Sequence, residues 1–321
     1  MKRLLFAALL LPLLSACQFD AGIVVCEDGT TPGPQLPVPA TIRDLQTQLG
    51  AARQTFTYTP GQVNTFTGAK GTIVTIPANA FVRHGQPISA PIQLTLREIF
   101  SRADMVLSNM PTVSNGQLLE SAGEVFLRAA DQDSTVRMVS GAVIRLQTQN
   151  PPTLASRDSM RLFVAPASAG TGSNNCFNWN LNSDPGSTLT PTATGNTMTV
   201  SSLLYNNGIG WFNCDRFYGT PNPLPLVVQV PATNVSDLNT MVFAVFRDMN
   251  GTLAVCNFTA PNVFQTANVP QGARVSIVVI RTENDKLYYG RQDGTVQAGT
   301  PFAPVLQETT AAALVAELTS L

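Results

Sequence analysis

The chain contains the stretch Ile92-Gln93-Leu94-Thr95-Leu96-Arg97-Glu98, in which apolar and polar side chains alternate. Because successive side chains of a strand point to opposite faces, this period of two predicts a β-strand with one dry and one wet face. An earlier run, Thr72-Ile73-Val74-Thr75-Ile76, has the β-branched composition of a strand and ends at Pro77. Together the two stretches predict antiparallel strands and the start of a β-sandwich.

Short strand-like segments continue along the chain, and the first three of them have the spacing of about 8–12 residues that is typical of sandwiches. They cover residues 124–128, 136–139, 142–146, 161–164, 226–230, 241–247, 253–256, 275–281 and 287–290. Glu283-Asn284-Asp285-Lys286 has the composition of a hairpin turn between the last two. The predicted fold class is therefore mainly β, with tandem antiparallel β-sandwich units.

Two short helices are expected at the ends of this β body. Thr41 with Asp44 three residues later predicts a capping box at the start of a helix over residues 42–53. Leu314, Val315 and Leu318 recur at helical spacing within residues 307–321. This spacing predicts a short C-terminal helix that docks on the body.

The composition of the 321-residue chain excludes several classes of protein. Charged residues make up 12% of it, against roughly 25% in an average soluble domain, and 23 Gly and 23 Pro fit a chain that turns often. A long, solvent-exposed helical bundle is therefore not expected. The formal net charge of −1 provides no basic field for a phosphate backbone, so nucleic acid is not an expected partner.

The N-terminus has the pattern of a targeting segment. Lys2 and Arg3 precede an apolar run over residues 4–14 that is too short to span a bilayer. The run ends in Leu14-Ser15-Ala16-Cys17, which resembles the lipobox of bacterial lipoproteins. An ordinary secretory signal with a chance cysteine is the alternative.

The lipobox resemblance implies that residues 1–16 are removed and that Cys17 carries a lipid anchor. In that family the cysteine thiolate takes a diacylglyceryl group, and the new amine usually receives an acyl chain such as palmitate. Several chains hold a protein to a membrane far more firmly than one. By the same resemblance, Gln18 after the cysteine favours the outer membrane, and the periplasmic and surface faces both stay open.

Changes of composition divide the chain into five parts. Residues 1–16 form the signal peptide, and residues 17–56 form a proline-rich tether with the first helix. Residues 57–152 form the first β-sandwich, 153–222 an aromatic-rich β segment, and 223–321 a C-terminal β unit with the terminal helix.

Two of these segments carry a further family resemblance. Residues 71–81 and 91–98 resemble the start of ZU5-type β-sandwich domains, in which a strand ends in Ile-Pro and an alternating strand returns. Residues 114–119, 121–124 and 210–217 resemble Bacteroidetes-type envelope lipoproteins. The resemblance implies an interaction module. Some ZU5 domains cut themselves at a His-Phe-Ser motif, which this chain lacks, so self-cleavage is not expected.

The remaining cysteines are Cys26, Cys176, Cys214 and Cys256. In the oxidising compartment that a secreted chain reaches, disulfides persist, and four cysteines allow three pairings. Buried free thiols are the alternative. Because the cysteines show no Cys-x-x-Cys spacing and the single histidine, His84, lies in a turn-like segment, neither a metal site nor a cofactor is expected.

The sequence contains no motif that points to an enzyme. A Ser-His-Asp or Cys-His mechanism would depend on His84 alone. A glycosidase would need paired carboxylates, for which the candidates are Glu98, Asp104, Glu120 and Glu124. The favoured interpretation places these carboxylates on a solvated face or pairs them with Arg97, Arg102 and Arg128.

Residues 205–218 form the densest aromatic patch of the chain. The candidate binding residues in it are Tyr205, Trp211, Phe212, Asp215, Arg216 and Phe217. One interpretation is an exposed platform for a sugar or peptide. The favoured one is a core plug, in which Trp211 and Phe217 fill the space between sheets while Asp215 pairs with Arg216.

The function expected from the sequence is that of a lipid-anchored cell-envelope protein that binds or scaffolds a protein or glycan partner without catalysis. The alternative is a carbohydrate-binding or carbohydrate-active surface lipoprotein that uses the Trp211 patch.

Overall fold

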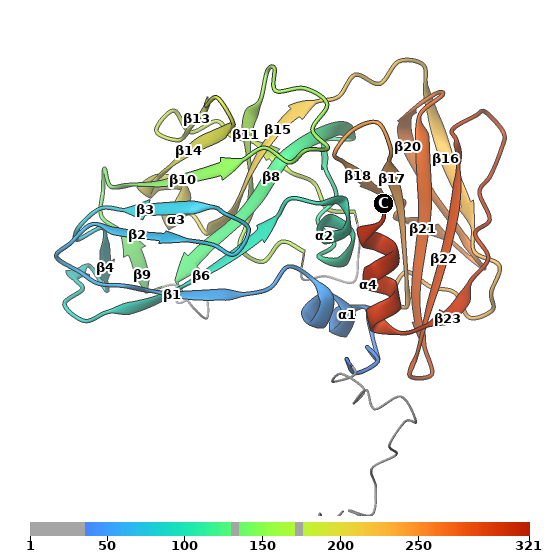
Figure 1. Cartoon of the computed structure of the whole chain (residues 1–321), viewed down its shortest axis with the longest axis horizontal. Helices are drawn as coiled ribbons and strands as arrows, with labels where there is room; N and C mark the ends of the chain where they lie inside the picture. The colour runs from blue at the N-terminus through green and yellow to red at the C-terminus, as the bar shows by residue number, and fades with distance from the viewer. Residues whose placement is uncertain (1–35, 130–134, 171–175) are drawn as a thin grey trace, which may run out of the picture. The chain divides into compact units, whose positions relative to one another are not determined.

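The computed structural model describes residues 36–129, 135–170 and 176–321, and residues 37–321 form one compact unit. The predicted signal peptide, Cys17 and Cys26 lie outside the described residues. Within them the chain is mainly β, with antiparallel sheets and short helices, as the sequence predicts (Figure 1).

The first sandwich is made of two large antiparallel sheets. One contains, in spatial order, β1 (Gln54–Tyr58), β6 (Ile92–Ile99), β8 (Gln117–Ala129), β15 (Ile209–Phe217), β11 (Arg161–Pro166) and β12 (Asn180–Leu181), with β7 (Val113–Ser114) beside β8. The other contains β13 (Thr188–Pro191), β14 (Gly195–Ser201), β10 (Val143–Gln149), β3 (Ile73–Ile76) and β2 (Asn64–Thr67). Leu94 and Leu96 of β6 pack with Val74 of β3 and Leu146 of β10 in the core between them.

A small sheet lies at one end of this sandwich. It contains β5 (Gln86–Pro87), β4 (Phe81–Arg83) and β9 (Val136–Met138). His84 lies in the turn between β4 and β5 with a positive φ of 50° and is exposed, which confirms the turn that its sequence predicts. The segments 57–152 and 153–222 share both large sheets, because β15 pairs with β8 and β14 pairs with β10.

The second sandwich is built from the C-terminal part of the chain. One sheet contains β16 (Pro223–Gln229), β20 (Val263–Pro270) and β19 (Asn257–Thr259). The other contains β18 (Thr252–Ala254), β17 (Thr240–Phe246), β21 (Arg274–Glu283), β22 (Lys286–Thr295) and β23 (Gln307–Thr309). The predicted hairpin at residues 283–286 is confirmed: Glu283 pairs with Lys286, and Asn284 and Asp285 both have the positive φ that a tight hairpin turn requires.

Helices cover the outer face of the sheet that holds β17 and β21 (Figure 1). The helices of the described residues are α1 (Ile42–Leu49), α2 (Arg102–Leu107), α3 (Ser202–Asn206) and α4 (Ala311–Thr319). Ile42 and Leu45 of α1 and Leu314 and Leu318 of α4 pack with Phe243 in this layer. The sheet is thus buried on both faces.

The first helix is shorter than predicted. It begins at the predicted capping box of Thr41 and Asp44 but ends at Leu49, four residues before the expected end at residue 53. Gly50 turns the chain out of the helix, and the Ala51 amide then donates a hydrogen bond to Ser108 Oγ at 2.9 Å. Residues 50–53 are needed as the connection that brings β1 alongside β6.

Polar side chains join the two sandwiches. Asn250 is fully buried, and its amide donates to the carbonyl oxygens of Phe100 at 3.0 Å and Ser121 at 2.8 Å. Thr112 and Thr252 exchange hydrogen bonds nearby through the Thr112 hydroxyl. Buried polar groups that are satisfied in this way hold the segments around β8 and β18 in one arrangement.

Candidate functional site

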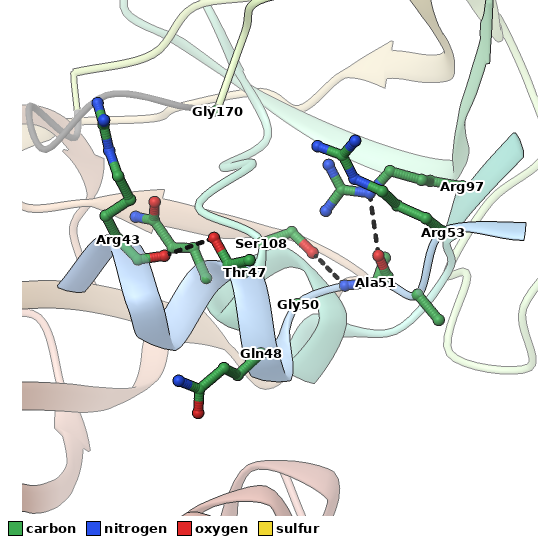
Figure 2. A pocket seen from close by; sticks show the side chains of 11 residues that line it. Arg43, Thr47, Gln48, Gly50, Ala51, Arg53, Arg97, Ser108 and Gly170 are labelled. Carbon is green, nitrogen blue, oxygen red and sulfur yellow. Dashed lines mark hydrogen bonds between the residues drawn. The ribbon is translucent and has the colours of Figure 1, made fainter. Parts of the chain in front are cut away.

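An open pocket with a volume of about 570 Å³ lies beside the end of α1 (Figure 2). Its walls come from α1, the connection at residues 50–53, β6, the residue after α2, and Gly170. Among the described residues of its lining, the ionisable side chains are Arg43, Arg53 and Arg97, and none is an Asp or Glu. The pocket therefore concentrates positive charge on a chain whose net charge is −1.

Arg97 reaches the pocket from a row of side chains that crosses three strands. In the large sheet, Arg97 of β6 pairs with Phe126 of β8, which pairs with Trp211 of β15. Residues that are opposite each other in a sheet share a face. The three side chains therefore lie together on the outer face, away from the sandwich core that contains Leu96.

Two contacts fix the Arg97 side chain. Its Nε donates a hydrogen bond to the Ala51 carbonyl oxygen at 2.9 Å, and its guanidinium carbon lies 5.2 Å from the centre of the Trp211 ring. Trp211 is 1% exposed and packs edge-on against Phe126, with ring centroids 5.2 Å apart. The indole thus supports the guanidinium from below by a cation–π contact.

Arg53 and Arg97 place two like charges next to each other. Figure 2 shows their guanidinium groups side by side, above the Ala51 carbonyl. Burial, together with the smaller effect of the Arg53 charge, lowers the pKa of Arg97 to about 10. Within the described ranges, neither side chain forms an ion pair with a carboxylate. At neutral pH Arg97 therefore stays cationic while its charge is only partly compensated.

The connection that forms the pocket wall is held by hydrogen bonds of its own. Ser108, which follows α2, accepts from the Ala51 amide, and the Thr47 hydroxyl donates to the Arg43 carbonyl at 2.9 Å. A Cβ at Gly50 would lie 2.4 Å from the Gln46 carbonyl oxygen, so only glycine fits this turn. The pocket wall is a packed connection rather than a free loop.

The aromatic patch at residues 205–218 is not an exposed platform. Trp211, Tyr205 and Phe212 are each 1% exposed, and Phe217 packs edge-on against Phe163 at 5.3 Å. Trp211 is buried, as the core-plug interpretation predicts, but it packs with Met105 and Trp179 on the outer face of its sheet and not in the space between the two sheets. The platform interpretation is wrong, because both faces of the sheet that holds β15 are covered. Trp211 acts on the pocket only by supporting Arg97.

The expected pairing of Asp215 with Arg216 is also wrong. Consecutive residues of a strand point to opposite faces, so their side chains cannot meet across β15. Arg216 instead forms an ion pair with Glu120 of β8, with 2.6 Å between Arg216 Nη2 and Glu120 Oε2. Asp215 is buried and accepts a hydrogen bond from the Asn213 amide at 2.7 Å.

The four carboxylates singled out in the sequence do not gather on a solvated face, and none pairs with the expected arginines. Glu98 is buried and accepts from the amides of Lys70 and Thr72, each at 2.9 Å. Asp104 pairs with Lys70 at 2.5 Å, and Glu120 pairs with Arg216. For Glu120 and Glu124 the expectation fails because β8 is covered on both sides, which the sequence of the strand alone does not reveal.

Glu124 is the exception among these acids. It is 0% exposed, and neither carboxylate oxygen has a hydrogen-bond partner among the described residues. Burial raises its pKa well above the usual value, and the charges of Asp215 and Asp104 raise it further. Burial likewise raises the pKa of Asp215, against the lowering effect of its hydrogen bonds from Ser121 and Asn213. Glu124 therefore favours the neutral, protonated form in the folded chain.

The structure selects one pairing for the described cysteines. Cys176 and Cys256 form a disulfide with 5.4 Å between their Cα atoms, which closes a sequence separation of 80 residues. Cys214 is free and buried, and burial raises the pKa of its thiol well above the usual value. A buried thiol of this kind packs as a small apolar group.

The part of the chain that the structure describes contains no group of three or more His, Cys, Asp or Glu side chains arranged to hold a metal ion. In the same part, no helix has the length and apolar character needed to cross a membrane.

From the sequence, Arg97 was expected only as a partner for carboxylates, and Arg53 was not expected at a site. The two are 44 positions apart, and only the pairing of β1 with β6 brings them together. A useful signal was present in the alternation of residues 92–98, which places Arg97 on the face opposite Leu96.

No family model, no curated protein and no solved structure matches this chain.

Proposed function

We propose that this chain is a lipid-anchored protein of a bacterial cell envelope that binds a partner without catalysing a reaction. The anchor rests on the sequence Leu14-Ser15-Ala16-Cys17 behind a short apolar run, where Cys17 would take the lipid. The ZU5-like resemblance of residues 71–98 adds an interaction module to this proposal.

The single observation that supports binding over catalysis is the chemistry of the pocket lining. Its ionisable side chains are arginines, and a guanidinium neither gives up nor takes a proton readily near neutral pH. Even Arg97, with its pKa lowered to about 10, stays protonated there. Such a lining holds a ligand by charge and hydrogen bonds, whereas general acid–base chemistry requires a group that titrates near the working pH.

The carbohydrate alternative depended on an exposed Trp211 patch, and Trp211 is buried. A sugar platform needs an aromatic face open to solvent, and the Trp211 indole is buried beneath Arg97. Of the carboxylates that a glycosidase would use, Glu98 and Glu120 are held in hydrogen bonds and ion pairs inside the body.

The anchor is tested by metabolic labelling with radioactive palmitate in a Gram-negative host. The Cys17→Ser variant is expected to lose the label, while the matched Cys26→Ser variant keeps it, because only Cys17 has the lipobox position. Undiminished labelling of Cys17→Ser would refute the anchor.

The binding role is tested in intact cells with a photo-cross-linking amino acid at Ala52, an exposed residue of the pocket lining. The matched control carries the same probe at Gln147, an exposed residue of β10. An adduct that forms at Ala52 and not at Gln147, detected by a shift in mass, is the expected result. Equal adducts at both positions, or none at Ala52, would contradict a binding role for this pocket.

A further inference from the structure

We propose that Arg53 and Arg97 form a binding site for a phosphate group, carried either by a soluble ligand or by a lipid headgroup. The inference rests on the proposed function, because it names the ligand chemistry of the same pocket.

Most hydrogen-bond donors of the Arg97 side chain have no acceptor among the described residues. A guanidinium carries five N–H groups in a planar fork, and the structure uses only the Nε–H of Arg97, which donates to the Ala51 carbonyl. Among the described residues, the terminal nitrogens of Arg97 have no hydrogen-bond acceptor, and the Arg53 guanidinium has none either. Four N–H groups of Arg97 are thus available to a ligand in the geometry that matches a phosphate.

The charge of the site favours an anion with more than one negative charge. Two guanidinium groups lie side by side, and the described residues of the pocket lining contain no carboxylate to neutralise them. Their mutual repulsion is relieved when a dianion lies between them, whereas a single carboxylate compensates only one of the two charges. A phosphate monoester carries about −1.5 to −2 at neutral pH and therefore fits better than an acetate-like group.

The site is also preorganised. Arg97 is fixed at its Nε by Ala51 and at its face by Trp211, and Ala51 is itself fixed by Ser108. A side chain that is already ordered loses little rotamer freedom when a ligand arrives. Arg53 is exposed and provides the second, adjustable arm.

The experiment titrates inorganic phosphate into the full chain carrying Cys17→Ser, at low ionic strength and pH 7.5, with calorimetric detection. Arg97→Gln and Arg53→Gln are each expected to weaken phosphate binding by about 10- to 100-fold, as expected for the loss of charged hydrogen bonds. Arg97→Lys keeps the charge but loses the fork, so its affinity is expected between those of the wild type and Arg97→Gln.

The matched control is Arg145→Gln on β10, which removes an exposed arginine outside the pocket. It is expected to leave phosphate affinity unchanged. An equal loss in Arg145→Gln, an unchanged affinity in Arg97→Gln and Arg53→Gln, or the absence of phosphate binding by the wild type would each overturn the proposal. Because Arg53 is exposed, its variant tests the site even if Arg97→Gln does not fold.

Two further measurements test whether the site prefers phosphate and whether the phosphate belongs to a soluble ligand or to a lipid headgroup. Acetate is expected to bind at least tenfold more weakly than phosphate, and equal binding would overturn the assignment to phosphate. Vesicles with phosphatidic acid, compared with pure phosphatidylcholine vesicles, show whether a lipid headgroup reaches the site. If these vesicles bind the wild type but not Arg97→Gln, the phosphate belongs to a lipid headgroup. If the chain binds inorganic phosphate but not the vesicles, the phosphate belongs to a soluble ligand. A specific adduct at Ala52 without phosphate binding would overturn this inference and leave the proposed binding function standing.

Discussion

Strands β8 and β21 are both long and both buried on their two faces, but they are filled differently. The middle of β21 is the apolar run Ile277-Val278-Val279-Ile280, which packs on one side against the second sandwich core and on the other against the helices. The middle of β8 instead contains Glu120 and Glu124, both 0% exposed. The two strands are thus equally buried, but the middle of β21 is apolar and the middle of β8 contains carboxyl groups.

The difference lies in how each strand satisfies its polar groups. In β21 the one buried charge, Arg281, pairs with Glu283 at 2.8 Å and donates to the Thr233 carbonyl oxygen at 2.6 Å, although its Nε has no hydrogen-bond partner among the described residues. In β8 the Glu120 charge is paired with Arg216, while Glu124 has no partner among the described residues. A buried polar group without a partner costs free energy that packing elsewhere must offset. The region around β8 therefore gives up stability that the region around β21 keeps.

The largest expected effect comes from truncating one large aromatic side chain in each region. Trp211→Ala, beside β8, and Phe243→Ala, beside β21, are each expected to reduce the free energy of unfolding by about 3–5 kcal/mol, because both leave a large cavity in a fully packed layer. Urea unfolding followed by circular dichroism measures both.

The two variants differ in the groups that the truncated aromatic ring contacts. Trp211 also supports the Arg97 guanidinium, whereas Phe243 contacts the helices α1 and α4. Trp211→Phe, which keeps an aromatic ring, is therefore expected to retain most of the stability and to disturb the pocket less than Trp211→Ala. A loss below about 1 kcal/mol in Trp211→Ala would contradict the buried, packed position of the indole.

The next effect concerns the disulfide between Cys176 and Cys256. Cys256 lies between β18 and β19 of the second sandwich, and Cys176 precedes β12 of the first. Replacing both by Ser is expected to cost about 2–4 kcal/mol, because the bond closes a long loop in the unfolded chain. The midpoint of urea unfolding, compared with that of Cys214→Ser, measures it.

The number of unfolding transitions in the variant without the disulfide is a second expected result. The buried Asn250 and the Thr112–Thr252 hydrogen bonds join the two sandwiches independently of the disulfide. A single transition is therefore expected to persist without it. Two separated transitions would show that the disulfide, and not the polar contacts, couples the regions.

The apolar strands were predictable and the polar ones were not, for a physical reason. The run of β-branched residues at 275–281 predicts a buried strand directly, and the turn residues Asn284 and Asp285 mark where the chain reverses. Glu120 and Glu124 read as solvated-face residues, because an isolated strand does not show whether a second layer covers it. Only the packing of Met105, Leu119 and Trp179 on the outer face of that sheet decides the matter.

The candidate site could not be predicted from the sequence, for a related reason. Arg53 was expected inside a helix, and the early end of α1 at Gly50 is what frees it to join Arg97. Trp211 was correctly expected in the core, yet its contact with Arg97 depends on the register of β6, β8 and β15. Long-range strand pairing therefore creates the site from residues that no local pattern connects.

The smallest expected effect is the most direct test of the comparison. Glu124→Gln removes the unpartnered carboxyl of β8 while keeping its shape. At pH 8 the variant is expected to be more stable than the wild type by at least about 1 kcal/mol, because it no longer holds a buried group that ionises in the unfolded chain. At pH 4 the two are expected to be nearly equal, since the wild-type carboxyl is then protonated.

The sign follows from the direction of the pKa shift. The pKa of Glu124 is raised in the folded chain, so the folded state binds its proton more tightly than the unfolded state does. The stability from this group is complete below its unfolded pKa and is lost as the pH rises through the folded pKa. Urea midpoints measured between pH 4 and pH 8 should thus fall more steeply with pH in the wild type than in Glu124→Gln.

Glu120→Gln supplies the matched control, because it makes the same chemical change at the other fully buried glutamate of β8 and has the opposite expected sign. It breaks a buried ion pair with Arg216 and is expected to destabilise the chain at pH 8. If both variants destabilise the chain equally at pH 8, Glu124 has a stabilising partner and β8 satisfies its charges as fully as β21 does. If only Glu120→Gln does so, the two neighbouring carboxylates of one strand differ because one is paired and the other is held neutral by burial.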